Sequence, residues 1–422
     1  SRVNAPTGQR RDPTGFTQAN GLSMASIAVI AVAIVASLFM AWALGASSNS
    51  APFAPAVGAN ALPTLRAALF IGIFAAVGAV VQGSNISETV GKELIRGVSI
   101  SPLAAAAGLL TAAAFIAIGV WTGYPIPAAF AVTGAMVGVG LSLGGTPAYG
   151  TYQRIVSFWA MVPPVSGTIA YTTATLLRRK DIPEPIAISI LGGLVGLIVA
   201  NMGTNVLPGP AGGGTIAGTV ARSIGGGPAL FGGYTLVMLL SSLLLGVTVA
   251  AGLYRMLTRD VDGGIRKFLV GLGALVAFSS GGSQVGLATG PLETLFETQL
   301  QLPGFVLLLL GGSGILLGAW MGAPRLLQAV AREYSALGER RSIAALVPGF
   351  IIAQAAIALG VPISFNNIII SAVIGSGLVE GSAGISGRKI GLTVGAWLST
   401  LVAAGAVGFV LYRGLALVPG VS

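Results

Sequence analysis

Three short clusters of neutral polar residues, set in otherwise apolar stretches, are the candidates for chemistry in this chain. They comprise Ser47, Ser48 and Asn49; Ser283 and Gln284; and Ser364, Asn366 and Asn367. Hydroxyl and carboxamide groups donate and accept hydrogen bonds without carrying charge. The sequence has no cysteine and no histidine, which excludes thiol chemistry and histidine-based metal or acid–base chemistry. The carboxylates form no evident catalytic pair, so the pattern favours ligand binding over an enzyme.

The clusters belong to a duplicated sequence. The segment Gly123–Leu141 returns as Gly360–Leu378, and the Gly/Ser-rich segment Gly45–Asn49 returns as Gly281–Gln284. Both pairs are separated by nearly the same distance along the chain, which marks two related halves. In a membrane protein, paired apolar segments broken by Gly and Pro predict a transporter whose site lies between the repeats.

Composition identifies a polytopic all-α membrane protein. Of 422 residues, 54% are hydrophobic and 8% charged, and mean hydropathy is +0.89, whereas a soluble domain is roughly 25% charged. Helices crossing about 30 Å of hydrocarbon are predicted over 22–44, 65–82, 103–122, 153–177, 185–201, 229–254, 265–280, 303–322, 342–360 and 389–412. Two Pro-led stretches, 126–145 and 363–380, are predicted to be re-entrant or broken helices, giving 10–12 membrane segments.

The expected organisation has four parts: a polar tail (1–21), a first repeat (22–181), central spans with a flexible Gly-rich loop (182–263) and a second repeat (264–422). The net charge of +10 comes from short basic clusters at span ends, which the positive-inside rule explains better than nucleic-acid binding. That rule assigns the clusters Arg178–Lys180 and Arg255–Lys267 to the cytoplasmic face and the Gly-rich loop to the outside. Charge alone leaves the relative orientation of the repeats open.

The two Pro-led segments have the residues that start a half-helix. Pro125 and Pro127 in the first, and Pro362 with Ser364 in the second, suit a first helical turn and its cap. Free N–H groups there carry partial positive charge and bind anions without a buried side-chain charge. We therefore expect one oxyanion cradle per half, the first made of backbone only, because Pro127–Phe130 offers no side-chain donor.

The motif frame resembles the inorganic phosphate transporter (PiT) family over about 40–412. Each half of that family carries Gly-Ala-Asn-Asp-Val-Ala-Asn, then Gly-x-Pro-Val-Ser-Thr-Thr-His before a Gly-rich helix. Ser47-Ser48 and Ser283-Gln284 stand where the first motif has Asn-Asp. Pro127–Phe130 and Ser364–Asn367 stand where the second has Ser-Thr-Thr-His. The chain keeps the frame and departs from the family at its polar signatures, including both aspartates.

The resemblance implies two inverted repeats that import phosphate through the plasma membrane by alternating access, driven by Na⁺ or H⁺, and a homodimer. With both aspartates replaced, neutral oxygens would have to hold the cation, which suits Na⁺ better than a proton relay. Sulfate is the alternative substrate of the same fold. A second hypothesis is a non-transporting membrane scaffold or partner subunit, in which Phe130, Leu287 and Phe365 would fill the space between the repeats.

Overall fold

Long apolar helices dominate the structure because backbone polar groups in lipid must be paired within the segment itself. The computed structural model describes residues 24–49, 51–122, 126–209, 213–335, 338–380 and 387–418. The predicted polar tail and Pro125 lie outside these ranges. Within them, eight helices are long and apolar enough to cross a membrane, and three shorter apolar ones accompany them. The fold is therefore that of the predicted polytopic membrane protein.

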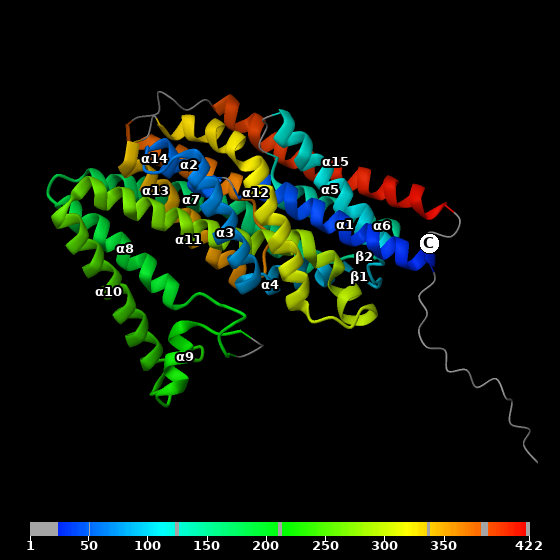
Figure 1. Ribbon diagram of the computed structural model, residues 1–422, viewed down its shortest axis with the longest axis horizontal. Helices are drawn as coiled ribbons and strands as arrows, with labels where there is room; N and C mark the ends of the chain where they lie inside the picture. Colours follow the sequence, from blue (N-terminus) through cyan, green and yellow to red (C-terminus); the bar gives the residue numbers. More distant parts are fainter. Residues whose placement is uncertain are drawn as a thin grey trace, which may run out of the picture.

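The elements follow the predicted segments closely (Figure 1). The first half contains α1 (Met24–Ala46), η1 (Ala51–Phe53), α2 (Ala54–Gly58), α3 (Thr64–Gln82), α4 (Ser84–Glu88), η2 (Thr89–Glu93), α5 (Pro102–Thr122), α6 (Ala128–Ser142) and α7 (Tyr149–Arg178). The central part contains α8 (Glu184–Ala200), α9 (Ile216–Ser223) and α10 (Leu236–Arg259). The second half contains α11 (Val261–Thr289), η4 (Gly290–Leu292), η5 (Leu295–Gln299), α12 (Gly304–Ser335), α13 (Gly338–Ala358), α14 (Phe365–Gly377), η6 (Leu378–Glu380) and α15 (Gly387–Ala416).

Two short antiparallel strand pairs join the helices at the loops. Strand β1 (Ile95–Arg96) pairs with β2 (Thr146–Pro147), and β3 (Ala229–Phe231) pairs with β4 (Tyr234–Thr235). The span predicted to begin at residue 229 therefore begins later, at Leu236. Gly232 and Gly233 both have positive φ, which turns the chain from β3 into β4 before the helix can start.

The two halves exchange packing partners. Helix α6 packs on α15 while its counterpart α14 packs on α7, and α3 packs on α11 while its counterpart α12 packs on α1. Glycines permit the closest crossings: a Cβ at Gly138 would clash with the Gly405 carbonyl, and one at Gly375 with the Gly167 carbonyl. Reciprocal contacts of this kind are expected of halves related by a two-fold axis. The inverted orientation of that axis stays a prediction, as do the domain boundaries.

Ion pairs define two faces of the molecule. Arg340 pairs with Glu184, and Arg266 with Glu339, at the starts of α8, α11 and α13. At the other ends of α7 and α11, Lys92 pairs with Glu293, and Arg154 with Glu93. The first face, which also holds Arg178–Lys180, keeps unbalanced basic residues, while the second face compensates its own. Lys92 is thus paired with acidic residues from much later in the chain, and the relative orientation of the repeats stays a prediction.

The central helices α8 and α10 pack on each other and splay from the helical body, with α9 at their far end (Figure 1). The loop between them, which was predicted to be flexible, contains a helix in its described part. It contains α9, whose N-cap Thr215 accepts a hydrogen bond from the Gly218 amide. Its beginning is bound to the first half, since the Asn205 amide donates to the Val81 carbonyl at 2.7 Å. The loop thus lies on the face opposite the basic clusters.

Candidate functional site

The first and second polar clusters meet where the end of α1 lies against the last third of α11. Asn49, directly after α1, accepts a hydrogen bond through its Oδ1 from the hydroxyl of Ser280. Ser280 lies one turn before Ser283 and Gln284 on α11, and all of these residues are fully buried. The first Gly/Ser-rich element therefore contacts α11 directly beside the second, as a site between repeats requires.

The third cluster joins the same region through its backbone and side chains. Gln284 Nε2 donates to the carbonyl of Ile363 at 3.0 Å, directly before Ser364. Asn366 Nδ2 lies 3.4 Å from the carbonyl of Ile126, in the segment that leads into α6. The starts of α6 and α14 therefore lie near one another and near α11.

Both half-helices begin with uncapped backbone. Pro127 is the N-cap of α6 and Ser364 that of α14, and neither side chain makes a capping hydrogen bond. The first amides of each helix have no intrahelical partner, so Ala128 and Phe365 open two helices whose N–H groups remain for a ligand. Each helix start also carries roughly half a positive charge from its dipole. No predicted site residue is charged, so these dipoles supply the local positive potential.

Five of the eight predicted residues bury a polar atom that has no hydrogen-bond partner among the described residues. These atoms are Ser48 Oγ, Asn49 Nδ2, Gln284 Oε1, Ser364 Oγ and Asn367 Oδ1. Their residues are at most 3% exposed. An unmet buried polar group costs about 1–3 kcal/mol, so such a concentration at one place is expected where a polar ligand completes the pairing.

The other predicted residues have protein partners. Ser47 Oγ donates to the Ala43 carbonyl at 2.7 Å, and Ser283 Oγ to the Ser280 carbonyl at 3.1 Å. Together with Asn366, these side chains are already hydrogen-bonded in this conformation. The structure thus divides the predicted set into residues with unmet polar atoms and residues that hold the surrounding backbone.

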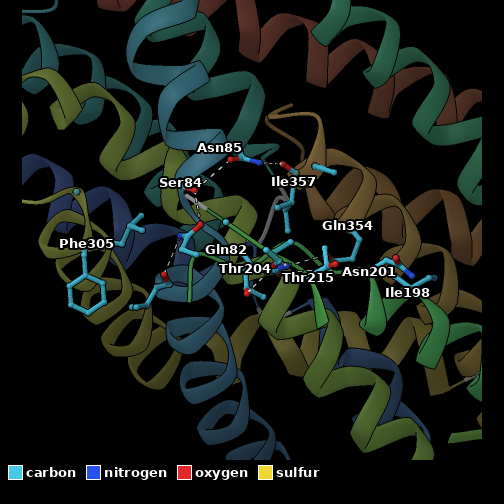
Figure 2. A pocket seen from close by; sticks show the side chains of 18 of the residues that line it. Gln82, Ser84, Asn85, Ile198, Asn201, Thr204, Thr215, Phe305, Gln354 and Ile357 are labelled. Carbon is cyan, nitrogen blue, oxygen red and sulfur yellow. Dashed lines mark hydrogen bonds between the residues drawn. The ribbon is translucent and has the colours of Figure 1, made fainter. Parts of the chain in front are cut away.

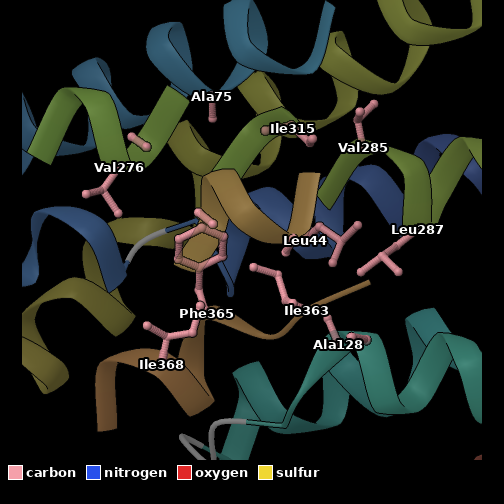
Figure 3. Close-up of a cluster of buried hydrophobic side chains, with 14 of the residues drawn as sticks. Leu44, Ala75, Ala128, Val276, Val285, Leu287, Ile315, Ile363, Phe365 and Ile368 are labelled. Atoms are coloured by element: carbon pink, nitrogen blue, oxygen red, sulfur yellow. The ribbon is translucent and has the colours of Figure 1, made fainter. Parts of the chain in front are cut away.

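Apolar side chains surround the polar atoms. Figure 3 shows Leu44, Ala128, Leu287, Ile363 and Phe365 converging from four elements. Phe365 and Leu287 are fully buried, so the site is closed to solvent in this conformation. A low-dielectric shell of this kind strengthens hydrogen bonds to any bound ion.

Sequence reasoning missed two supporting residues. Ser280 donates a hydrogen bond to Asn49. The one sequence feature that could have indicated this role is its position directly before the Gly281–Gln284 element. Trp159 of α7 stacks on Phe130 with ring centroids 3.9 Å apart and donates through Nε1 to the Pro362 carbonyl at 2.7 Å. Phe130 therefore packs against Trp159, and Trp159 fixes the segment before α14.

Comparisons with known proteins agree with this architecture. The pattern of the phosphate transporter family matches residues 44–408. A protein of Pyrococcus furiosus named "Putative phosphate permease" is 24% identical, over 95% of this chain and 99% of its own. A protein of the same description from Chlamydia trachomatis is 25% identical, over 90% of this chain and 96% of its own.

A solved structure entitled "The sodium-dependent phosphate transporter" has the same fold, with a TM-score of 0.77 and 23% sequence identity over 93% of this chain and all of that one. The family match and the fold thus define a membrane transport protein. The chain belongs to the phosphate transporter family, and the resemblance expected from its motifs is confirmed.

Proposed function

We propose that this protein imports inorganic phosphate across the cell membrane together with Na⁺, by alternating access of its two halves. The observation that carries the proposal is the set of buried, unpartnered polar atoms between the halves. Family membership supports phosphate transport. The packing of α6 on α15 and of α14 on α7 supports alternating access, because helices from both halves lie against each other and a relative movement of the halves would change these contacts.

The unpartnered atoms include donors that suit an oxyanion. Asn49 Nδ2 is a donor only, and the hydroxyls of Ser48 and Ser364 can donate by rotation. The free amides that begin α6 and α14 add further donors from both halves. An anion in this position would receive hydrogen bonds from each repeat, which couples its binding to their relative position.

The acceptors favour phosphate over sulfate. Gln284 Nε2 is committed to the Ile363 carbonyl, which leaves Gln284 Oε1 as a buried acceptor, and Asn367 Oδ1 is also unpartnered. Phosphate near neutral pH carries at least one O–H that can donate to such an oxygen, whereas sulfate carries none. The same neutral oxygens are suitable ligands for Na⁺ as a co-transported ion, without a buried carboxylate.

The alternative of a membrane scaffold fits less well. The burial of Phe365 and Leu287 is what a filled interface would show. A scaffold, however, gains nothing from unmet polar atoms that cost about 1–3 kcal/mol each, and apolar substitutes of similar size would stabilise it.

The test is uptake of labelled phosphate into proteoliposomes with and without an inward Na⁺ gradient. We expect Na⁺-dependent uptake that excess sulfate inhibits weakly, and its loss in Ser364→Ala and Asn367→Ala. Ser37→Ala is the matched control, because Ser37 is fully buried on α1 but its hydroxyl already donates to the Ala288 carbonyl. Correctly inserted protein that moves neither anion would support the scaffold instead. The predicted homodimer is tested by the mass of the purified protein.

A further inference from the structure

A second polar region lies apart from the candidate site, on the face where α3, α8 and α13 end. A cavity of about 870 Å³ opens there, and Figure 2 shows side chains that line it. Its wall carries carboxamides and hydroxyls from separate parts of the chain, among them Asn85, Asn201, Thr204 and Asn205. A water molecule occupies about 30 Å³ in the liquid, so this space holds many waters and admits a hydrated ion.

The floor of the cavity is a pair of glutamines from the two halves. Gln82 of α3 and Gln354 of α13 donate to each other's Oε1 atoms at 3.1 and 3.2 Å. Gln82 Nε2 also donates to the Gly203 carbonyl at 2.8 Å. Gln82 is 2% and Gln354 9% exposed. The pair links α3 to α13 by neutral hydrogen bonds, which water can replace when the helices separate.

The floor connects directly to the candidate site. Gln354 Nε2 donates to Ser279 Oγ at 2.7 Å. Ser279 precedes Ser280, whose hydroxyl donates to Asn49. One turn of α11 therefore carries both the contact with the cavity floor and the contact with the site.

The rim of the cavity is charged but compensated. Glu293 and Glu297 line it, and Lys92 Nζ pairs with both carboxylates at 3.1 and 2.9 Å. The single positive charge of Lys92 offsets about half of the negative charge that two bare carboxylates would present to an arriving anion. The remaining negative charge attracts the Na⁺ that the proposed function requires.

We propose that this cavity is the vestibule through which ions reach the site, and that the Gln82–Gln354 pair is the gate between them. The inference rests on the proposed transport function and adds its access route. In the present conformation the vestibule is open and the pair is closed. Separation of α3 from α13, which belong to different halves, would break the pair and expose the site from this face.

Cysteine labelling tests the gate without requiring transport, because the sequence has no cysteine of its own. Ala358→Cys reports on the vestibule, which Ala358 lines, and Ser283→Cys reports on the fully buried site. Each variant is reconstituted and treated, from one side at a time, with a membrane-impermeant methanethiosulfonate. We expect fast labelling of Ala358→Cys from one side and slow labelling of Ser283→Cys from that side.

Removal of the gate should speed labelling of the site selectively. Adding Gln82→Ala and Gln354→Ala removes the reciprocal hydrogen bonds, and we expect Ser283→Cys to react about thirtyfold faster. Asn201→Ala, which alters the vestibule wall but not the pair, should leave that rate unchanged. The proposal is overturned if Ala358→Cys does not react from either side, or if the double substitution leaves Ser283→Cys as slow as before. A protein that labels as expected but moves no phosphate would refute the proposed function alone.

Discussion

Replacing Ser364 by alanine should stabilise the ligand-free protein while weakening its response to phosphate. Ser364 Oγ is buried and unpartnered, and as the N-cap of α14 it makes no capping hydrogen bond. The substitution therefore removes an unmet polar atom and breaks no contact. We expect a gain of about 1–3 kcal/mol in the free energy of unfolding without ligand.

Bound phosphate offsets much of this gain, because it stabilises the wild type more than the variant. At a phosphate concentration of 100 Kd, binding stabilises the native protein by about 2.7 kcal/mol. Loss of a hydrogen bond to a charged group, about 2 kcal/mol, weakens affinity roughly thirtyfold. The variant would then gain only about 0.9 kcal/mol at the same concentration. The ligand-induced increase in stability should fall to roughly a third.

Thermal unfolding in detergent measures both quantities. For a chain of 422 residues, 1–3 kcal/mol corresponds to a shift in Tm of only about 1–3 °C, so replicate scans are needed. Ser37→Ala provides the control, because it loses a satisfied hydrogen bond to Ala288 and should lower Tm without changing the phosphate response. A Tm for Ser364→Ala below that of the wild type without ligand, with an undiminished phosphate shift, would refute the reasoning.

Three further changes test other parts of the structure. Gln284→Glu adds a carboxylate, a stronger ligand for Na⁺, beside the other unmet oxygens. Phosphate uptake should therefore reach half its maximum at a lower Na⁺ concentration. An unchanged Na⁺ dependence would argue against a cation site there. Burial raises the pKa of Glu293 above its usual 4.5, although Lys92 opposes the shift. The folded state therefore binds the proton of Glu293 more tightly than the unfolded state does, and stability falls as pH rises from 4.5 through the raised pKa. Lys92→Met should raise that pKa further, and Tm scans across pH should show a larger loss of stability towards neutral pH than in the wild type. Gly375→Ala places a Cβ against the Gly167 carbonyl and should cost about 1–3 kcal/mol, visible as a lower Tm, whereas Gly377→Ala, where nothing lies within 4 Å, should not.

Sequence alone was sufficient for the membrane segments and for the starts of the two half-helices. The length of the apolar stretches identified the spans, because every helix that crosses the hydrocarbon core must be long and apolar enough to do so and must pair its own backbone groups. Proline placed the beginnings of α6 and α14 well, since it suits a first turn and disfavours helix in the residue before it. Ala128 and Phe365 begin the helices within a few residues of the predicted starts at 126 and 363.

Contacts between the halves could not be predicted in the same way. Gln82 and Gln354 belong to none of the predicted polar clusters, and no local pattern shows that α3 and α13 bring them together. The partners of Lys92 come from more than two hundred residues later in the chain. Such pairings depend on how α3, α11 and α13 pack, and periodicity within one helix carries no information about them.

The two halves contribute unequally to the proposed site, and this asymmetry explains how it can work without the aspartates of the related motif. At the start of α6, Ala128 and Ala129 offer backbone amides only, whereas at the start of α14 Ser364 and Asn367 offer side-chain atoms as well. A buried carboxylate would need a cation or several donors to offset its desolvation. Neutral amides and hydroxyls avoid that cost in the empty protein, and they still provide donors for an anion and acceptors for Na⁺. Selection between ions then depends on how the unmet donors and acceptors are arranged. The second half provides three of the five, the hydroxyl of Ser364 and the amide oxygens of Gln284 and Asn367.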